Sequence, residues 1–293
     1  MAETNNIEKK SYLITQNDLN GKTERILNSF QLYHVGICNR IKQLFTNMRL
    51  HAGEYDTVNI HWPVKGRVTS RFYDLFNFEG FQRINEINYS VYLDNKYYEE
   101  ATWRLFLKSA EFQELRQFGL NYIDFEFHNI PQPFIDLYKP YFLALKPSKY
   151  VKEVMDTIHL PEKCVAVHFR HSSDWKEYNR WGDDDINQFF KEMHKYSDDT
   201  YFYVACPDQG VHDAVIEEFK ERALFIDMNY ANVDNVKDVA ELFLLSKCDK
   251  LIGTYGSTFT ECAWWLSGCN QEVTIIGSDE TWKNGGLPDW AKK

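Results

Sequence analysis

The stretch that decides the fold is Val165-Ala-Val-His-Phe-Arg-His-Ser-Ser-Asp-Trp175. Its first part, Cys164–Val167, is apolar on both faces, which is typical of a parallel strand covered by helices on both sides. Because strand side chains alternate, His168 and Arg170 point to one face and Phe169 to the other. Ligands of open α/β sheets lie at the carboxyl ends of such strands. Arg170 is therefore a candidate phosphate ligand through its planar guanidinium, or else a structural residue at a strand end.

The sequence beyond this stretch alternates short apolar runs with segments of helical spacing. That alternation predicts a doubly wound parallel sheet of the α/β class, with helices on both of its faces. The expected strands after the first cover residues 200–205, 223–226, 250–254 and 272–277, and the expected helices cover 182–196, 211–222, 236–246 and 258–266.

The first half of the chain contains a β-loop-α-β unit. Residues 26–33 and 57–62 are its expected strands, and residues 40–51 have the apolar spacing of a helix. Residues 1–24 are polar and are expected either to fray or to form a sheet edge. Further helices are expected over 98–107, 111–118, 134–145 and 151–158, the third of them kinked or interrupted at Pro140.

A candidate hinge, Lys146-Pro-Ser148, separates the two halves, since a proline disfavours helix at the residue before it. The length of 293 residues fits two domains of ~150. The sequence therefore predicts an N-terminal domain of residues 1–146 and a C-terminal domain of residues 147–293, with a ligand cleft between them.

Composition excludes several classes of protein. A net charge of −10 at pH 7 argues against a broad nucleic-acid or anionic-membrane surface. No apolar run reaches ~18 residues, so no membrane insertion is expected. The first residues lack the apolar core of a signal peptide, and the six cysteines are scattered without a Cys-x-x-Cys pair. These features predict free thiols in a reducing compartment and a cytoplasmic location.

A second informative segment is residues 242–261, in which a helix feeds a strand that turns at Gly253–Gly256 into a new helix. Ser257 and Thr258 stand at the start of that helix. The first turn of a helix presents unpaired N–H groups and a positive dipole end, which together bind phosphate. The alternative is a capping box formed by Thr258 and Glu261, which needs no ligand.

A third segment, Gly36-Ile-Cys-Asn-Arg40, lies between the first predicted strand and its helix. Gly36 would allow a positive φ or a close approach of the backbone to a ligand. Asn39 and Arg40 begin the helix and are expected to face the strand ends, where a ligand would lie. Arg40 could instead be an ordinary helix residue facing solvent.

Together the three segments resemble the fucosyltransferase superfamily of GT-B glycosyltransferases. Gly36–Arg40 is similar to its Gly-x-x-Asn-Arg loop, and His168-Phe-Arg170 to its His-x-Arg motif. Leu242–Phe259 is similar to its late Leu-Leu-Ser-x-x-Asp … Ser-Thr-Phe segment, and Ser173-Asp-Trp175 to a motif of some O-fucosyltransferases. The family often has Gly-Asp where this chain has Ser-Ser-Asp174, and residues 80–145 match nothing in it. The resemblance implies a GT-B fold of two Rossmann-like domains.

The resemblance also implies roles for individual residues. Arg170 would bind the nucleotide diphosphate and neutralise the leaving group, while His168 would position it or contact the nucleotide. Because an Arg and helix N–H groups can stabilise that charge by themselves, no metal is expected. The nine histidines show no metal-ligand spacing either. The expected nucleotide-sugar ligands are Gly36, Asn39, Arg40, His168, Asp174, Asp208, Asp238, Ser257, Thr258 and Phe259.

An inverting transfer needs a base for the acceptor hydroxyl. Asp74, in the loop after the strand at 57–62, is the candidate, with Glu79 and His34 behind it. Asp74 could instead cap a short helix. Asp183-Asp-Asp185 has the Asp-x-Asp form of a metal site, but acidic residues at that position favour the start of a helix.

The predicted activity is an inverting, metal-independent transfer of L-fucose from GDP-fucose to a hydroxyl of a glycan. The first alternative keeps the fold and mechanism but uses another nucleotide-sugar donor, such as UDP-xylose, because the departure at Ser172–Asp174 leaves the donor open. The second alternative is a non-catalytic protein that binds a nucleotide or a sugar.

Overall fold

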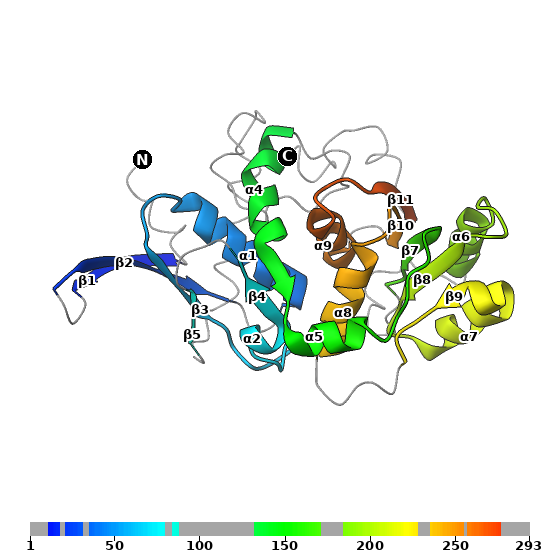
Figure 1. Ribbon diagram of the computed structural model, residues 1–293, viewed down its shortest axis with the longest axis horizontal. Helices are drawn as coiled ribbons and strands as arrows, with labels where there is room; N and C mark the ends of the chain where they lie inside the picture. The colour runs from blue at the N-terminus through cyan, green and yellow to red at the C-terminus, as the bar shows by residue number, and fades with distance from the viewer. Residues whose placement is uncertain are drawn as a thin grey trace. The chain divides into compact units, whose positions relative to one another are not determined.

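The computed structural model describes residues 11–17, 21–31, 35–79, 84–87, 132–170, 184–227, 235–254 and 257–276. These residues fall into two compact units that divide between Lys146 and Pro147 (Figure 1). The first unit holds the described residues up to Lys146, and the second unit holds those from Pro147 onward. The helices expected over 98–107 and 111–118 lie outside the described residues.

The first unit is built on a four-stranded sheet in the order β1-β2-β3-β5. β1 runs antiparallel to β2, while β2, β3 and β5 are parallel to one another. β1 lies at the sheet edge, where Leu13 pairs with Leu27 and Ile14 with Ile26, in agreement with the edge alternative for the polar N-terminal region. The strands are β1 (Ser11–Asn17), β2 (Thr23–Phe30), β3 (Thr57–His61) and β5 (Ile84–Ile87).

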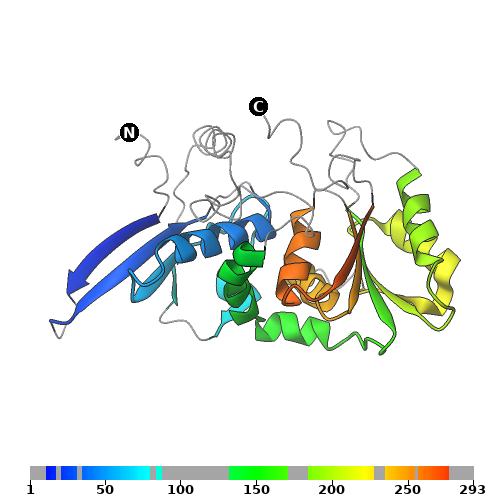
Figure 2. The same cartoon turned by 90° about the horizontal axis from the view of Figure 1, so that it is seen from above.

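Helix α1 (Ile37–Leu50) connects β2 to β3 and lies along the sheet (Figure 2). Its apolar residues Ile41, Leu44, Phe45 and Met48 are buried at helical spacing. α4 (Gln132–Ala144) packs on it and continues through Pro140, so the predicted interruption is wrong, although the helix itself was expected. The smaller elements of this unit are α2 (Phe72–Leu75), β4 (Phe76–Phe78) and β6 (Leu145–Pro147), with β4 paired to β6.

The second unit contains the predicted doubly wound sheet, whose five strands are all parallel and lie in the order β11-β10-β7-β8-β9. The strand that contains the first quoted stretch, β7, is central, and every residue of it is buried. The strands are β7 (Cys164–His168), β8 (Tyr201–Ala205), β9 (Ala223–Leu224), β10 (Lys250–Thr254) and β11 (Glu272–Ile276).

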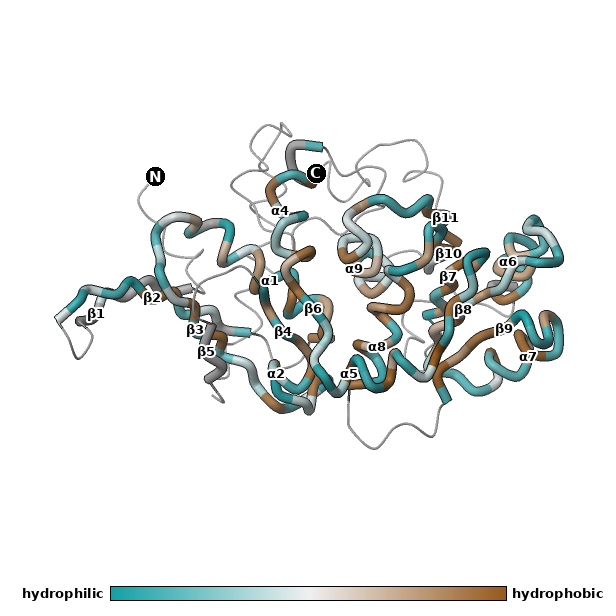
Figure 3. The backbone as a smooth tube through the Cα atoms, in the orientation of Figure 1, coloured by the Kyte–Doolittle hydropathy of each residue, from teal (hydrophilic) through white to brown (hydrophobic). Residues whose placement is uncertain are grey.

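Helices cover both faces of this sheet. α6 (Asp184–Met193) and α7 (Gln209–Phe219) lie on one face, and α8 (Val236–Leu245) and α9 (Thr258–Leu266) lie on the other (Figures 1 and 2). A short 3₁₀ turn, Lys220–Arg222, follows α7, and α5 (Lys149–Met155) precedes β7. Figure 3 shows hydrophobic residues along α8, which is buried over almost its whole length.

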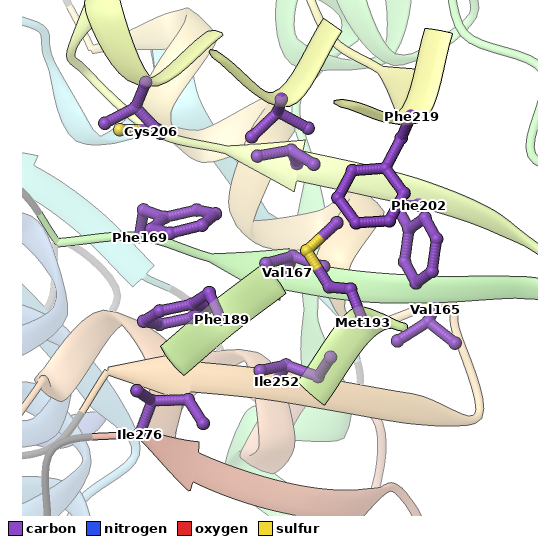
Figure 4. Packing of buried hydrophobic residues seen from close by; sticks show 13 residues of the cluster. Val165, Val167, Phe169, Phe189, Met193, Phe202, Cys206, Phe219, Ile252 and Ile276 are labelled. Carbon is purple, nitrogen blue, oxygen red and sulfur yellow. The ribbon is translucent and has the colours of Figure 1, made fainter. Parts of the chain in front are cut away.

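The core beneath α6 and α7 confirms the predicted alternation of β7. Val165, Val167 and Phe169 all point into it, and the Phe169 ring stacks on Phe189 with the centroids 4.0 Å apart (Figure 4). His168 therefore lies on the opposite face, toward α8 and α9. Among the described helices, none combines the length and the apolar character needed to cross a bilayer.

Candidate functional site

The carboxyl ends of β7 and β10 form the topological switch point of the second unit. From β7 the chain moves to β8 and β9 on one side, and it returns to β10 and β11 on the other. Connections that leave two neighbouring strands in opposite directions open a crevice outside their carboxyl ends, where ligands of such sheets bind. His168 is the last residue of β7, and Thr254 is the last residue of β10.

The Thr254 hydroxyl fixes the backbone that leads to Arg170. It donates to the carbonyl oxygen of His168 at 2.8 Å and accepts from the backbone N–H of Arg170 at 2.9 Å. On the other side, the N–H of Phe169 donates to the carbonyl oxygen of Ala205 in β8 at 3.0 Å. The start of the Arg170 side chain is therefore held from both neighbouring strands, just beyond the end of β7.

His168 is 6% exposed and lies between two residues of α9. Its Nδ1 is 2.7 Å from the Thr260 hydroxyl, and its ring stacks on Phe259 with centroids 4.9 Å apart. Burial, with a smaller contribution from the positive charge of Arg170, lowers the pKa of His168 to about 3. The imidazole is therefore neutral at physiological pH, and Arg170 supplies the positive charge at this end of β7.

Gly253 allows α9 to lie close to β10. A Cβ atom at this position would be 2.0 Å from the Thr260 Cγ2 atom, a separation that no side chain tolerates. Glycine is therefore required here for close packing of the strand against the helix. The sequence interpretation assigned Gly253 only to a turn.

Ser257 is the N-cap residue of α9, but its hydroxyl makes no capping hydrogen bond to the helix. It is 5% exposed, and within the described part of the chain its Oγ has no hydrogen-bond partner. The alternative capping box of Thr258 and Glu261 is wrong, because the N-cap residue is Ser257 and makes no side-chain bond to the helix. Glu261 is buried and accepts instead from the indole N–H of Trp265 at 3.0 Å. Thr258 and Phe259 occupy the first turn and are partly buried.

In the predicted loop of the first unit, the Arg40 side chain has structural partners. Arg40 is fully buried and donates to the carbonyl oxygens of Pro63 at 2.6 Å and Lys65 at 3.0 Å, with its guanidinium 5.2 Å from the centre of the Trp62 ring. Burial lowers the pKa of Arg40 to about 10. The alternative that Arg40 faces solvent is wrong, since this side chain fixes the turn after β3.

Gly36 lacks the positive φ that the sequence analysis allowed for. Its φ of −68° and ψ of 168° are extended backbone that any residue adopts. An added Cβ would meet nothing within 4 Å. Neither a positive φ nor a close approach within the protein explains this glycine, which is the N-cap residue of α1. Asn39 lies in the first turn of α1 and is partly buried.

The predicted carboxylates mostly serve backbone caps. Asp74 accepts from the N–H of Arg71 at 3.3 Å, as the helix-cap alternative proposed. Asp208 caps α7 and accepts from Gly210 at 2.8 Å and Val211 at 3.2 Å. Four further candidate positions remain. Asp238 is exposed in the first turn of α8 and accepts from Asn235, Glu79 is exposed, and Asp174 and His34 lie outside the described residues.

The structure thus brings together His168, Arg170, Ser257, Thr258 and Phe259 in one unit. It adds two residues that sequence reasoning missed, Thr254 and Thr260. Their signal in the sequence is weak, since each is a single hydroxyl within an apolar strand or helix. Gly253, near the end of β10, was the available indication of close packing in this segment.

Several solved structures share this arrangement of elements. A NodZ alpha-1,6-fucosyltransferase soaked with GDP-fucose matches with a TM-score of 0.56 at 14% identity, covering 83% of this chain and 92% of that one. The fucosyltransferase NodZ from Bradyrhizobium matches with a TM-score of 0.56 at 13% identity, over 83% and 93%. POFUT1 in complex with GDP matches with a TM-score of 0.53 at 12% identity, over 90% and 100%.

The chain has the GT-B fold of these fucosyltransferases. The fold expected from the three sequence segments is thereby confirmed. No family model and no curated protein matches the sequence. At identities of 11–14% the similarity establishes architecture, and the chemistry of this chain has to be argued from its own residues.

Proposed function

We propose that the protein is a glycosyltransferase that binds a nucleoside-diphosphate sugar at the carboxyl ends of β7 and β10. The observation that carries the proposal is the start of α9, where Ser257 leaves both its own hydroxyl and the first-turn N–H groups without a side-chain cap. Thr254 links this turn to Arg170, because its carbonyl oxygen accepts from the N–H of Ser257 and its hydroxyl from that of Arg170. A helix start and an arginine held by one residue suit a diphosphate.

The proposed chemistry follows from charge. A departing nucleoside diphosphate gains negative charge, and preorganised donors lower the barrier by stabilising it. Arg170 would supply a guanidinium and α9 its N–H groups, so the transfer needs no metal. His168 would take part as a neutral donor or as a support for the nucleotide. Thr258 and Phe259 would line the same turn.

We further propose that the donor is GDP-fucose and that the transfer inverts the sugar configuration. The support is the order of the three sequence segments, together with a fold shared with a fucosyltransferase soaked with GDP-fucose. Asp74 stays the candidate base, since its bond to the N–H of Arg71 is long at 3.3 Å and a substrate hydroxyl could compete with that N–H. UDP-xylose is the alternative donor, tested alongside.

The test is a panel of GDP, UDP, GDP-fucose and UDP-xylose, each with and without EDTA, read by thermal shift and by calorimetry. A ligand at 100 times Kd that binds only the folded state stabilises it by about 2.7 kcal/mol. A GDP-selective shift that survives EDTA supports the fucosyl proposal. A UDP-selective shift would support the proposed phosphate site but indicate a different donor sugar.

The matched variants are Arg170→Ala and Arg222→Ala. Arg222 is a partly buried arginine of the same unit. Its guanidinium lies over the rings of Phe219 and Phe202, on the face of the sheet that α6 and α7 cover. The proposal expects nucleotide binding and turnover to be lost in the first variant and kept in the second. Absence of any nucleotide shift in the unaltered protein would overturn the proposal.

A further inference from the structure

The hydroxyl of Thr260 has one hydrogen-bond partner in the described residues. Thr260 is fully buried in α9, and its Oγ1 lies 2.7 Å from Nδ1 of His168. A hydroxyl can donate or accept, and so can Nδ1, depending on which ring nitrogen carries the proton. The positions of the heavy atoms therefore leave two arrangements of the protons.

Only one of these arrangements satisfies the buried hydroxyl. If Nδ1–H donates to Oγ1, the proton of Thr260 has no acceptor, and an unpaired buried donor is costly. If Thr260 donates to Nδ1, both groups are satisfied and the ring proton must sit on Nε2. We infer that Thr260 is a positioning residue that fixes His168 as the Nε2–H tautomer, making Nε2 a hydrogen-bond donor to the diphosphate of the nucleotide.

The packing of Thr260 fixes the direction of its hydroxyl. Its Cγ2 fills the space where a Cβ would stand on Gly253, with only 2.0 Å between the two positions. A β-branched side chain has few χ1 choices within a helix. Because the methyl group packs against β10, the hydroxyl remains directed at Nδ1 of His168.

The other edge of the imidazole is available to a ligand. The ring is stacked on Phe259 in the first turn of α9, and no described group bonds Nε2. Burial and the charge of Arg170 keep the ring neutral by lowering its pKa to about 3, so a second ring proton does not obscure the tautomer. Nε2–H and the guanidinium of Arg170 would then be two donors for one anionic group, which rests on the proposed function.

The experiment compares Thr260→Val, which keeps the shape and removes the hydroxyl, with Thr260→Ser, which keeps the hydroxyl. The tautomer of His168 is read in the full chain by long-range ¹⁵N–¹H NMR of histidine-labelled protein, and GDP affinity by calorimetry. We expect Nε2–H in the unaltered protein and in Thr260→Ser. In Thr260→Val, His168 should no longer be held in a single tautomer, and the affinity for GDP should fall about tenfold.

The matched control is Thr200→Val, which removes another buried hydroxyl of the same unit. Thr200 stands just before β8, at the amino end of the sheet, and contacts the Ser197 hydroxyl at 3.1 Å. It should change neither the tautomer nor the affinity. A merely structural role of Thr260 would lower stability in both valine variants and leave the tautomer alone.

Two results would overturn the inference. One is Nδ1–H in the unaltered protein, which needs no variant to fold, and the other is unchanged GDP affinity in Thr260→Val. Failure of the proposed function looks different, because the unaltered protein would then bind neither GDP nor UDP. In that case the tautomer alone decides whether Thr260 fixes the ring.

Discussion

The two strand–loop–helix junctions that carry the sequence motifs use their polar groups in opposite ways. At the start of α1, Arg40 is fully buried and its guanidinium bonds the carbonyl oxygens of Pro63 and Lys65. At the start of α9, the Ser257 hydroxyl is buried, and no residue in the described part of the chain bonds it. A buried polar group is normally paired, so a pair within the protein indicates a structural role and an unpaired group invites a ligand.

The contrast assigns Arg40 a structural role, whereas Ser257 keeps a hydroxyl that the proposed ligand could bond. Arg40 and Arg170 both belong to motifs singled out in the sequence. The Arg40 side chain holds a turn, whereas the backbone N–H of Arg170 is bonded by Thr254. Variants at these positions should therefore affect different quantities.

The largest effect is expected for Arg170→Ala. Loss of a preorganised donor to the leaving group typically lowers turnover by about 10²–10³-fold. The free energy of unfolding should change less than in an Arg40 variant, since the bond to Thr254 comes from the backbone of Arg170 and survives the substitution. The measurement is initial rate with GDP-fucose beside a urea titration. Turnover within threefold of the unaltered protein would remove Arg170 from the mechanism.

Arg40→Met should show the reverse pattern. It leaves the buried carbonyl oxygen of Pro63 and the partly buried carbonyl oxygen of Lys65 without their charged donor. Each such bond contributes ~1.5–3 kcal/mol, so we expect a loss of about 3 kcal/mol in unfolding free energy. GDP affinity per folded molecule should stay within twofold. Denaturant unfolding and calorimetry measure the two quantities. A loss of GDP affinity without a loss of stability would return Arg40 to the binding site.

The sequence predicted the second unit well because its signals are local. Apolar runs ending at His168 and Thr254 and the helical spacing of 236–246 gave strands and helices whose observed bounds differ by a few residues. β1 was expected only as a possible edge, because its pairing with β2 depends on register across a turn. The uses of the polar side chains were harder to foresee.

Long-range contacts explain those misses. Arg40 bonds a carbonyl 23 residues away, and Thr260 meets His168 at a separation of 92 residues. No local pattern carries such information. Gly36 and Gly253 look alike in sequence, yet only Gly253 is required by packing.

Glu241 tests whether any buried polar group in the second unit indicates a ligand. Burial raises its pKa to about 7, against the opposing effect of Lys237, whose Nζ lies 3.0 Å from Oε1. Because the folded-state pKa exceeds the usual 4.5, the native state holds the proton longer, and stability falls as pH rises from about 4.5 to 7. Glu241→Gln should be more stable than the unaltered protein by about 3 kcal/mol at pH 8 and within about 0.5 kcal/mol of it at pH 4.5.

Urea titrations at the two pH values give this difference. Parallel stability curves for Glu241→Gln and the unaltered protein would show that the carboxyl is not buried as described. GDP affinity should be unchanged at pH 8, since the charged partner of Glu241 is Lys237 in the same helix, α8. An effect on affinity would mean that a buried polar group influences the site even when it is paired within the protein, as Glu241 is with Lys237.

The smallest effects come from a matched pair of serines, one at each junction. Ser29 is fully buried, and its Oγ accepts from Gln31 at 2.9 Å and Asn47 at 2.8 Å, so Ser29→Ala should cost about 1–2 kcal/mol of stability. Ser257→Ala removes a hydroxyl with no described partner and should cost under ~0.5 kcal/mol, because no bond within the protein is lost.

The effects on GDP affinity should be opposite to those on stability. We expect a loss of affinity of about three- to tenfold in Ser257→Ala and none in Ser29→Ala. The physical reason is that a hydroxyl left unpaired by the fold gains its bond only when the anion is bound, whereas Ser29 has already made its bonds within the sheet and α1. Equal losses of stability in the two variants would mean that Ser257 has a structural partner after all, and the contrast between the two junctions would then fail at its most specific residue.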